Sequence, residues 1–117
     1  MTDPLDRVRA TALELPETEE RVSHGQPTFF VAGKQFAQFR ANHHGDGRTV
    51  VCVRIGNLEE QAMLLEADPE TYTKPAYLPS WIGMNAGDGA DWDLIGDRIA
   101  ASWELAAPRR LLEAGGR

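Results

Sequence analysis

The sequence predicts an α+β protein in which a single antiparallel β-sheet meander is flanked by N- and C-terminal helices in a two-layer sandwich. Apolar residues recur at helical spacing near both ends of the chain, whereas apolar and polar residues alternate between residues 21 and 55. With 117 residues, the chain is long enough to bury about two-thirds of its unfolded surface as one domain. We therefore expect a single domain spanning residues 1–117.

The first element is an amphipathic helix within residues 1–16. Asp3 is a favourable N-cap residue, and Pro4 suits the first helical position. Pro16 ends the apolar pattern, which consists of Leu5, Val8, Ala12 and Leu15.

The central part of the chain, residues 21–55, is predicted to be a β-meander with turns at its glycines. In segments 34–41 and 48–55, one set of alternate residues is expected to face the core: Ala37, Phe39, Ala41, Thr49, Val51, Val53 and Ile55. The opposite set carries the basic side chains Lys34, Arg40, Arg48 and Arg54, together with Phe36, Gln38, Val50 and Cys52. The loop at 42–47 carries two glycines that suit a hairpin.

A second helix is expected over residues 57–67, because Asn57 and Glu60 have the spacing of a capping box. Its apolar side is expected to close over the meander, and it consists of Leu58, Ala62 and Leu65. Residues 71–85 are predicted to form a hairpin of two short strands that prolines confine to an edge of the sheet.

The last helix is expected over residues 91–107, after the N-cap residue Asp91. Its apolar stripe consists of Trp92, Ile95, Ile99, Trp103 and Ala106. Residues 112–117 are expected to be a frayed tail. The core is predicted to include Phe29, Phe39, Val51, Val53, Ile95, Ile99 and Trp103.

Charge is unevenly distributed along the chain. Residues 23–55 contain four of the twelve basic residues and one acid, Asp46, which gives this segment a net charge of +3. The other residues, with eight basic and seventeen acidic side chains, sum to −9, and the whole chain carries −6. An acidic total argues against nucleic-acid binding over the whole surface, so any contact with DNA should use a local patch.

The cysteine count and the absence of long apolar segments indicate a cytoplasmic protein. One cysteine excludes an intrachain disulfide and any cysteine-based zinc cluster. The N-terminal stretch has no apolar region typical of a signal peptide, and no segment approaches the roughly 18 apolar residues of a transmembrane helix. We expect no membrane partner, and a monomer or weak dimer.

Motifs of the common enzyme and cofactor classes are missing, among them GxGxxG, the Walker phosphate loop, HExxH, GxSxG and CxxC, so no cofactor is expected. His43, His44 and Asp46 are residue types that bind zinc, iron or nickel, especially if His24 folds close to them. The alternative is a polar hairpin loop in which Asp46 caps its own turn. We expect the polar hairpin loop and no bound metal.

Seven short motifs in order resemble the MmcQ/YjbR family over nearly the whole chain. They are Gly25-x-Pro27-x-Phe29, Gly33-Lys34-x-Phe36, His43-His44-Gly45-Asp46-Gly47-Arg48, Asp68-Pro69 with Pro75-x-Tyr77, Trp81-Ile82-Gly83, Asp91-Trp92-Asp93, and Ala106-Ala107-Pro108-Arg109-Arg110-Leu111. The resemblance implies a frataxin/CyaY-like fold and the double-wing DNA-binding function with which bacterial members are labelled. The link from Tyr77 to Trp81, which would form the second wing, is shorter than the family's usual crossover.

Four functions compete on these grounds, and the fourth, a catalyst, is the least supported. The first is DNA binding by charge, through Lys34, Arg40, His43, His44, Arg48 and Arg54. The second is a scaffold that binds a small anionic molecule or a protein, with a ligand pocket at His24, Tyr77 and Trp81. The third is frataxin-type metal handling by the histidine loop or by the acidic residues Glu14, Glu17, Glu19 and Glu20.

Overall fold

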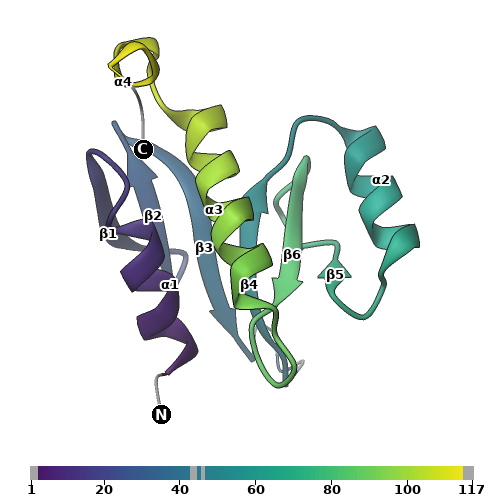
Figure 1. The fold of residues 1–117 in the computed structure, drawn as a ribbon. Coiled ribbons are helices and arrows are strands. Elements are labelled where there is room, and N and C mark those ends of the chain that lie inside the picture. Colours follow the sequence, from purple (N-terminus) through teal and green to yellow (C-terminus); the bar gives the residue numbers. More distant parts are fainter. Residues whose placement is uncertain (1–2, 43–44, 46, 115–117) are drawn as a thin grey trace.

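The core of the fold is one six-stranded sheet in which every pair of neighbouring strands is antiparallel (Figure 1). A computed structural model describes residues 3–42, 45 and 47–114. The strands are β1 (Thr18–Ser23), β2 (Gln26–Val31), β3 (Lys34–Ala41), β4 (Thr49–Arg54), β5 (Tyr72–Thr73) and β6 (Trp81–Asn85). Their order in the sheet is β1-β2-β3-β4-β6-β5. The predicted α+β class with a single antiparallel sheet is confirmed.

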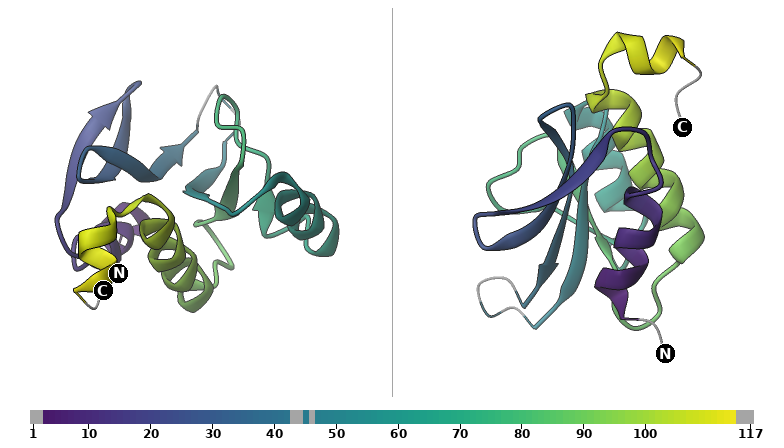
Figure 2. Two further views of the ribbon diagram at one scale, coloured as in Figure 1. Left: turned by 90° about the horizontal axis from the view of Figure 1, so that it is seen from above. Right: turned by 90° about the vertical axis from the view of Figure 1, so that its left-hand side faces the viewer.

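Two helices cover one face of the sheet, and we call this the helix face. They are α1 (Pro4–Ala12) and α3 (Trp92–Ala106), which contact each other and β3. Figure 2 shows them together on one side, with the connection between β5 and β6 on the opposite side, which we call the open face. None of the helices in the described ranges is both long and apolar enough to cross a membrane.

The helix face carries the main apolar core of the protein. All seven residues predicted for the core are buried in one cluster there, and Trp103 and Phe29 are its largest fully buried side chains. The indole nitrogen of Trp103 donates a hydrogen bond to the carbonyl of Pro16 at 3.0 Å, which ties α3 to the end of the first helical segment. The prediction of core residues from alternation and helical spacing is confirmed.

A β-bulge in β3 overturns part of the predicted side-chain alternation. The register between β2 and β3 shifts, since Phe29 pairs with Ala37 but Phe30 pairs with Gln35, which leaves Phe36 as the extra residue. Phe36 is fully buried in the helix-face cluster. Its predicted position beside the basic residues was therefore wrong.

Ser102 of α3 satisfies the backbone groups that the bulge leaves without ladder partners. Its hydroxyl donates to the carbonyl of Phe36 at 2.5 Å and accepts a hydrogen bond from the amide of Arg54 at 2.8 Å. Both bonds connect the helix directly to strands β3 and β4. These two hydrogen bonds stabilise the bulge, because they give its backbone groups partners.

The second helix, α2 (Leu58–Ala67), does not close over the meander as predicted. It lies beside β5 at the edge of the sheet (Figure 1). Gln61 is its buried residue and donates to the carbonyl of Trp81 at 2.7 Å, whereas Leu58, from the predicted apolar side, is exposed. Leu64 and Leu65 of this helix are partly buried against the apolar core, so this packing and the hydrogen bond of Gln61 together hold the helix in place.

Some element boundaries also differ from the predicted ones. Strand β1 begins at Thr18 rather than Arg21, and β5 has only two residues. A short helix, α4 (Arg109–Glu113), follows α3 where only a loop and the start of a frayed tail were expected. Residues 115–117 of the predicted tail lie outside the described residues.

Candidate ligand pocket on the open face

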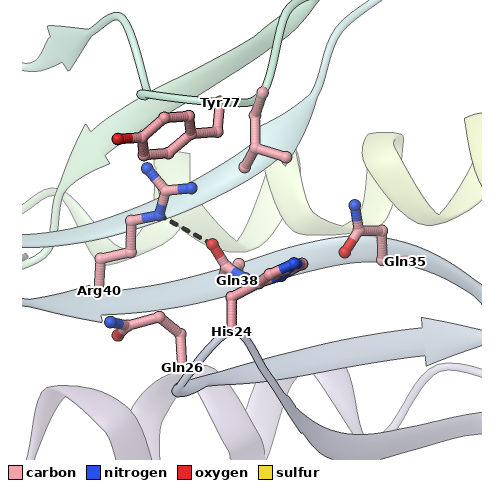
Figure 3. Close-up of a pocket in the computed structure, with 7 residues that line it drawn as sticks. His24, Gln26, Gln35, Gln38, Arg40 and Tyr77 are labelled. Atoms are coloured by element: carbon pink, nitrogen blue, oxygen red, sulfur yellow. Dashed lines mark hydrogen bonds between the residues drawn. The ribbon is translucent and has the colours of Figure 1, made fainter.

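The open face carries a cavity of about 500 Å³ between three parts of the chain. The β1–β2 turn contributes His24, β2 contributes its first residue, Gln26, and strand β3 forms the floor. The third wall is the connection between β5 and β6, residues 74–80, which we call the 74–80 loop. The complete lining is His24, Gln26, Gln35, Gln38, Arg40, Tyr77 and Leu78 (Figure 3).

Arg40 is the single cationic lining residue, and the protein buries it to 7% exposure. Its Nε donates to Oε1 of Gln38 at 2.8 Å, and the rest of its guanidinium points toward Tyr77 (Figure 3). Among the described residues, no carboxylate lies within ion-pair distance of this group. A buried guanidinium without an acidic partner is costly, because its desolvation is not offset by an opposite charge.

A chain of hydrogen bonds fixes the orientation of Arg40. The amide nitrogen of Gln38 donates to the hydroxyl of Thr28 at 3.0 Å, and to the carbonyl of Ser23 at 3.5 Å. The hydroxyl of Thr28 in turn donates to the carbonyl of Gln26 at 3.0 Å. Because the amide nitrogen of Gln38 is held in this way, its oxygen is directed at the guanidinium of Arg40.

Next to the pocket, the open face is closed by a small apolar cluster. It comprises Val50, Cys52 and Trp81, with Leu78 of the 74–80 loop packed against them. At Gly83 a β-carbon would lie 2.7 Å from Cγ2 of Thr73 and 2.9 Å from Cγ1 of Val50, so this part of the face is tightly packed. The cavity is therefore confined to the area over β3.

Burial controls the chemistry of the only cysteine. It raises the pKa of the Cys52 thiol to about 11, although the nearby charge of Arg40 opposes this shift. The thiol therefore stays protonated near neutral pH, and a protonated thiol is a poor nucleophile. Cys52 therefore behaves as a small apolar residue of the open face.

The two loops that border the pocket hold unusual backbone conformations. Tyr77 and Ser80 in the 74–80 loop have φ angles of 66° and 65°, and His24 in the β1–β2 turn has a φ of 53°. Such positive values are uncommon for residues other than glycine. The strained positions thus flank the cavity on both sides.

The four basic residues predicted for a common face do not form an exposed row. Lys34 is exposed, but the bulge gives its neighbour Gln35 the side of β3 that Gln38 and Arg40 occupy. Arg54 is half-buried over the ring of Trp81, donates to the carbonyl of Gln35 at 2.7 Å, and has a pKa lowered by burial. Arg48 is exposed, so only Lys34 and Arg48 present largely solvated charges.

His43, His44 and Asp46, which were considered for DNA or metal binding, lie outside the described residues. Within the described ranges, no group of three or more potential metal ligands comes together.

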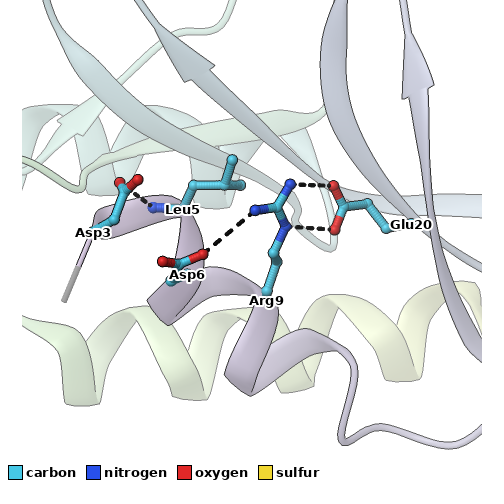
Figure 4. A network of polar contacts seen from close by, with 5 residues as sticks. All are labelled: Asp3, Leu5, Asp6, Arg9 and Glu20. Carbon is cyan, nitrogen blue, oxygen red and sulfur yellow. Dashed lines mark hydrogen bonds and ion pairs between the residues drawn. The ribbon is translucent and has the colours of Figure 1, made fainter.

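Three of the four acidic residues considered for metal handling, Glu17, Glu19 and Glu20, engage basic partners. Glu20 forms two hydrogen bonds with Arg9, at 2.8 and 2.9 Å, and Asp6 adds a third contact (Figure 4). These carboxylates raise the pKa of Arg9. Glu17 accepts two hydrogen bonds from Arg110 of α4, and this partner lowers the pKa of its carboxyl group. The remaining pair is Glu19 with Arg21.

Of the three residues predicted for a ligand pocket, His24 and Tyr77 line the cavity, whereas Trp81 lies beside it in the apolar cluster. The sequence analysis did not assign the three glutamines and Leu78 to the pocket. The two glutamines of β3, Gln35 and Gln38, were the available signal, but their common side depends on the bulge.

Comparisons with known proteins agree with this architecture. Protein DR2400 of Deinococcus radiodurans, whose domain is described as DUF419, has a crystal structure that superposes with a TM-score of 0.73. The sequences are 17% identical, and the match covers 94% of this chain and 85% of that one, which shows a common fold. A comparison with curated proteins found no match. The family model YjbR matches residues 13–105, and the chain belongs to the YjbR family.

Proposed function

We propose that this protein is a non-enzymatic binding module that takes a small anionic molecule into the open-face pocket, with Arg40 as the anion-binding group. One observation carries the proposal: a nearly buried guanidinium faces a cavity and has no carboxylate partner among the described residues. A bound anion would supply the missing opposite charge in a site where water screens little.

The shape and lining of the cavity support this proposal. Its volume of about 500 Å³ falls within the range of small-molecule sites, which is roughly 300–1,000 Å³. A guanidinium presents its donors in a planar fork that fits a carboxylate or phosphate in a bidentate manner. Gln38 fixes that fork in advance, so binding would cost little side-chain entropy.

Charge-driven DNA binding, predicted from the sequence, is the alternative function. It has weaker support, because phosphate tracking needs several accessible charges, and Arg40 and Arg54 are respectively buried and half-buried. The same set of variants can test both functions.

The test is a titration of ¹⁵N-labelled protein with sodium acetate and with inorganic phosphate, followed by NMR at constant ionic strength. We expect saturable shifts at the amides of Gln35 and Gln38 and at Nε of Arg40, with a Kd on the order of millimolar for such small probes. Arg40→Gln should abolish them, whereas the matched control Arg48→Gln should keep them. The absence of saturable shifts, or equal shifts in Arg40→Gln, would overturn the proposal.

A parallel fluorescence anisotropy titration with labelled duplex DNA separates the two functions. If DNA binds, is weakened by Arg48→Gln and Lys34→Gln, and is unaffected by acetate, the alternative is correct and the pocket proposal loses its support. Thermal unfolding of every variant establishes that the compared proteins are folded.

A further inference from the structure

We infer that the anion is a planar aromatic monocarboxylate whose ring packs on Tyr77. This inference rests on the proposed anion-binding function and adds the chemical class of the ligand. It follows from the number of charges in the pocket, the position of Tyr77 and the nature of the other polar lining residues.

The charge of the pocket favours a monoanion. Arg40 is the only cationic side chain of the seven lining residues, with His24 beside the cavity mouth as an exposed imidazole. The pocket is built from strands and loops, so it offers no helix N-terminus, which is a frequent element of phosphate sites. One guanidinium matches the single charge and planar geometry of a carboxylate better than it matches a phosphate dianion.

The position of Tyr77 favours an aromatic body. Its ring and the guanidinium of Arg40 are directed toward each other in the lining of the cavity (Figure 3), and the residue is 79% exposed. A carboxylate bound to Arg40 would place its attached group beside this ring and near Leu78. Contact between aromatic rings contributes about 0.5–1.5 kcal/mol beyond the burial of area, which corresponds to about two- to tenfold in affinity.

The glutamine side chains favour polar substituents on that ring. In the lining of the cavity, Gln26 lies beside Arg40, and Gln35 lies at the other end, beyond Gln38 (Figure 3). Each amide group can both donate and accept a hydrogen bond, and neither carries a charge. Hydroxyl or ring-nitrogen substituents on the ligand would find partners there without adding a second charge.

The test compares benzoate, 4-hydroxybenzoate, acetate, benzamide and phenyl phosphate by the same NMR titration. We expect benzoate to bind about two- to tenfold more tightly than acetate. The hydroxyl of 4-hydroxybenzoate should strengthen binding further, neutral benzamide should not bind, and phenyl phosphate should bind more weakly than benzoate. Tyr77→Ala should weaken benzoate binding more than acetate binding, so that the two anions bind about equally, whereas Tyr77→Phe should retain the preference for benzoate.

The outcomes separate the two claims. If no anion binds, the proposed function itself fails. If acetate and benzoate bind equally in the wild type, if Tyr77→Ala changes both alike, or if phenyl phosphate binds best, anion binding stands and the aromatic carboxylate class is wrong. Leu58→Ala, an exposed apolar change on α2, serves as the control for non-specific effects on aromatic probes.

Discussion

The two faces of the sheet are built from the same strands but bury different kinds of side chain. The helix face is a dry cluster of apolar side chains, completed by α1 and α3. The open face, which no helix covers, contains a buried hydrogen-bond chain that ends at Arg40, together with a small apolar cluster. Stability should therefore depend mainly on the first face, and ligand binding on the second.

The largest expected effect is on the helix face. Trp103→Ala should lower the free energy of unfolding by about 3–5 kcal/mol, because it removes a fully buried indole and its hydrogen bond to Pro16. Urea unfolding at neutral pH measures the change. Leu105→Ala, on the same helix but half-exposed, is the matched control and should stay within about 0.5 kcal/mol of the wild type. Similar losses in both variants would show that the assigned core is wrong.

The buried polar chain of the open face should give the next largest effect. Gln38→Leu keeps the approximate side-chain volume, but it leaves Nε of Arg40 without its acceptor and removes the hydrogen bond that the hydroxyl of Thr28 accepts. We expect a loss of about 1–3 kcal/mol in the free energy of unfolding, together with weaker anion binding. Thr28→Val removes both hydrogen bonds of the hydroxyl but leaves the contact between Gln38 and Arg40, so it should weaken anion binding less. Unchanged stability in Gln38→Leu would mean that this chain does not hold Arg40.

The sequence was sufficient to predict the helix face because that face depends only on periodicity. Val51 and Val53 occupy alternate positions of β4, and Ile95, Ile99 and Trp103 repeat at helical spacing, so each packs where its period directs. No long-range information is needed for such a pattern.

The open face could not be predicted in the same way, because the bulge at Phe36 reverses the alternation within β3. Ser102 supports that bulge from a position 66 residues away in the sequence. The 74–80 loop also reaches β3 only through tertiary packing. For these reasons the sequence identified His24 and Tyr77 as pocket residues but did not identify the glutamines. A bulge supported by a distant helix has no local sequence signal.

The thiol of Cys52 allows the burial of the open face to be measured as a pH dependence. Its pKa is about 11 in the folded protein against an ordinary value of 9.0, so folding favours the protonated thiol. This contribution to stability is fully present below pH 9, and it is lost as the pH rises toward 11. Between about pH 8 and about pH 10, the wild type should lose about 1 kcal/mol more than Cys52→Ala. Parallel pH profiles for the two proteins would show that the thiol is accessible to water.

The smallest expected effect concerns an ion pair that lies away from both faces. Glu17 accepts two hydrogen bonds from Arg110, which lower the pKa of its carboxyl group below the ordinary value of 4.5. A lowered pKa stabilises the fold at pH values above the ordinary one, and this contribution disappears as the pH falls through the lowered pKa.

Because both side chains are largely exposed, solvent screens the pair and its effect on Tm should be slight. Arg110→Gln should melt slightly below the wild type at neutral pH, and the two curves should converge in acid, where Glu17 is protonated in both proteins. Added salt should shrink the difference at neutral pH for the same reason. The exposed pair of Arg109 with Glu113 on the same helix provides the control, because Arg109→Gln leaves the partner of Glu17 in place. If Arg110→Gln and the wild type differ by the same amount at every pH, the effect comes from the packing of α4 and not from the charge of Glu17.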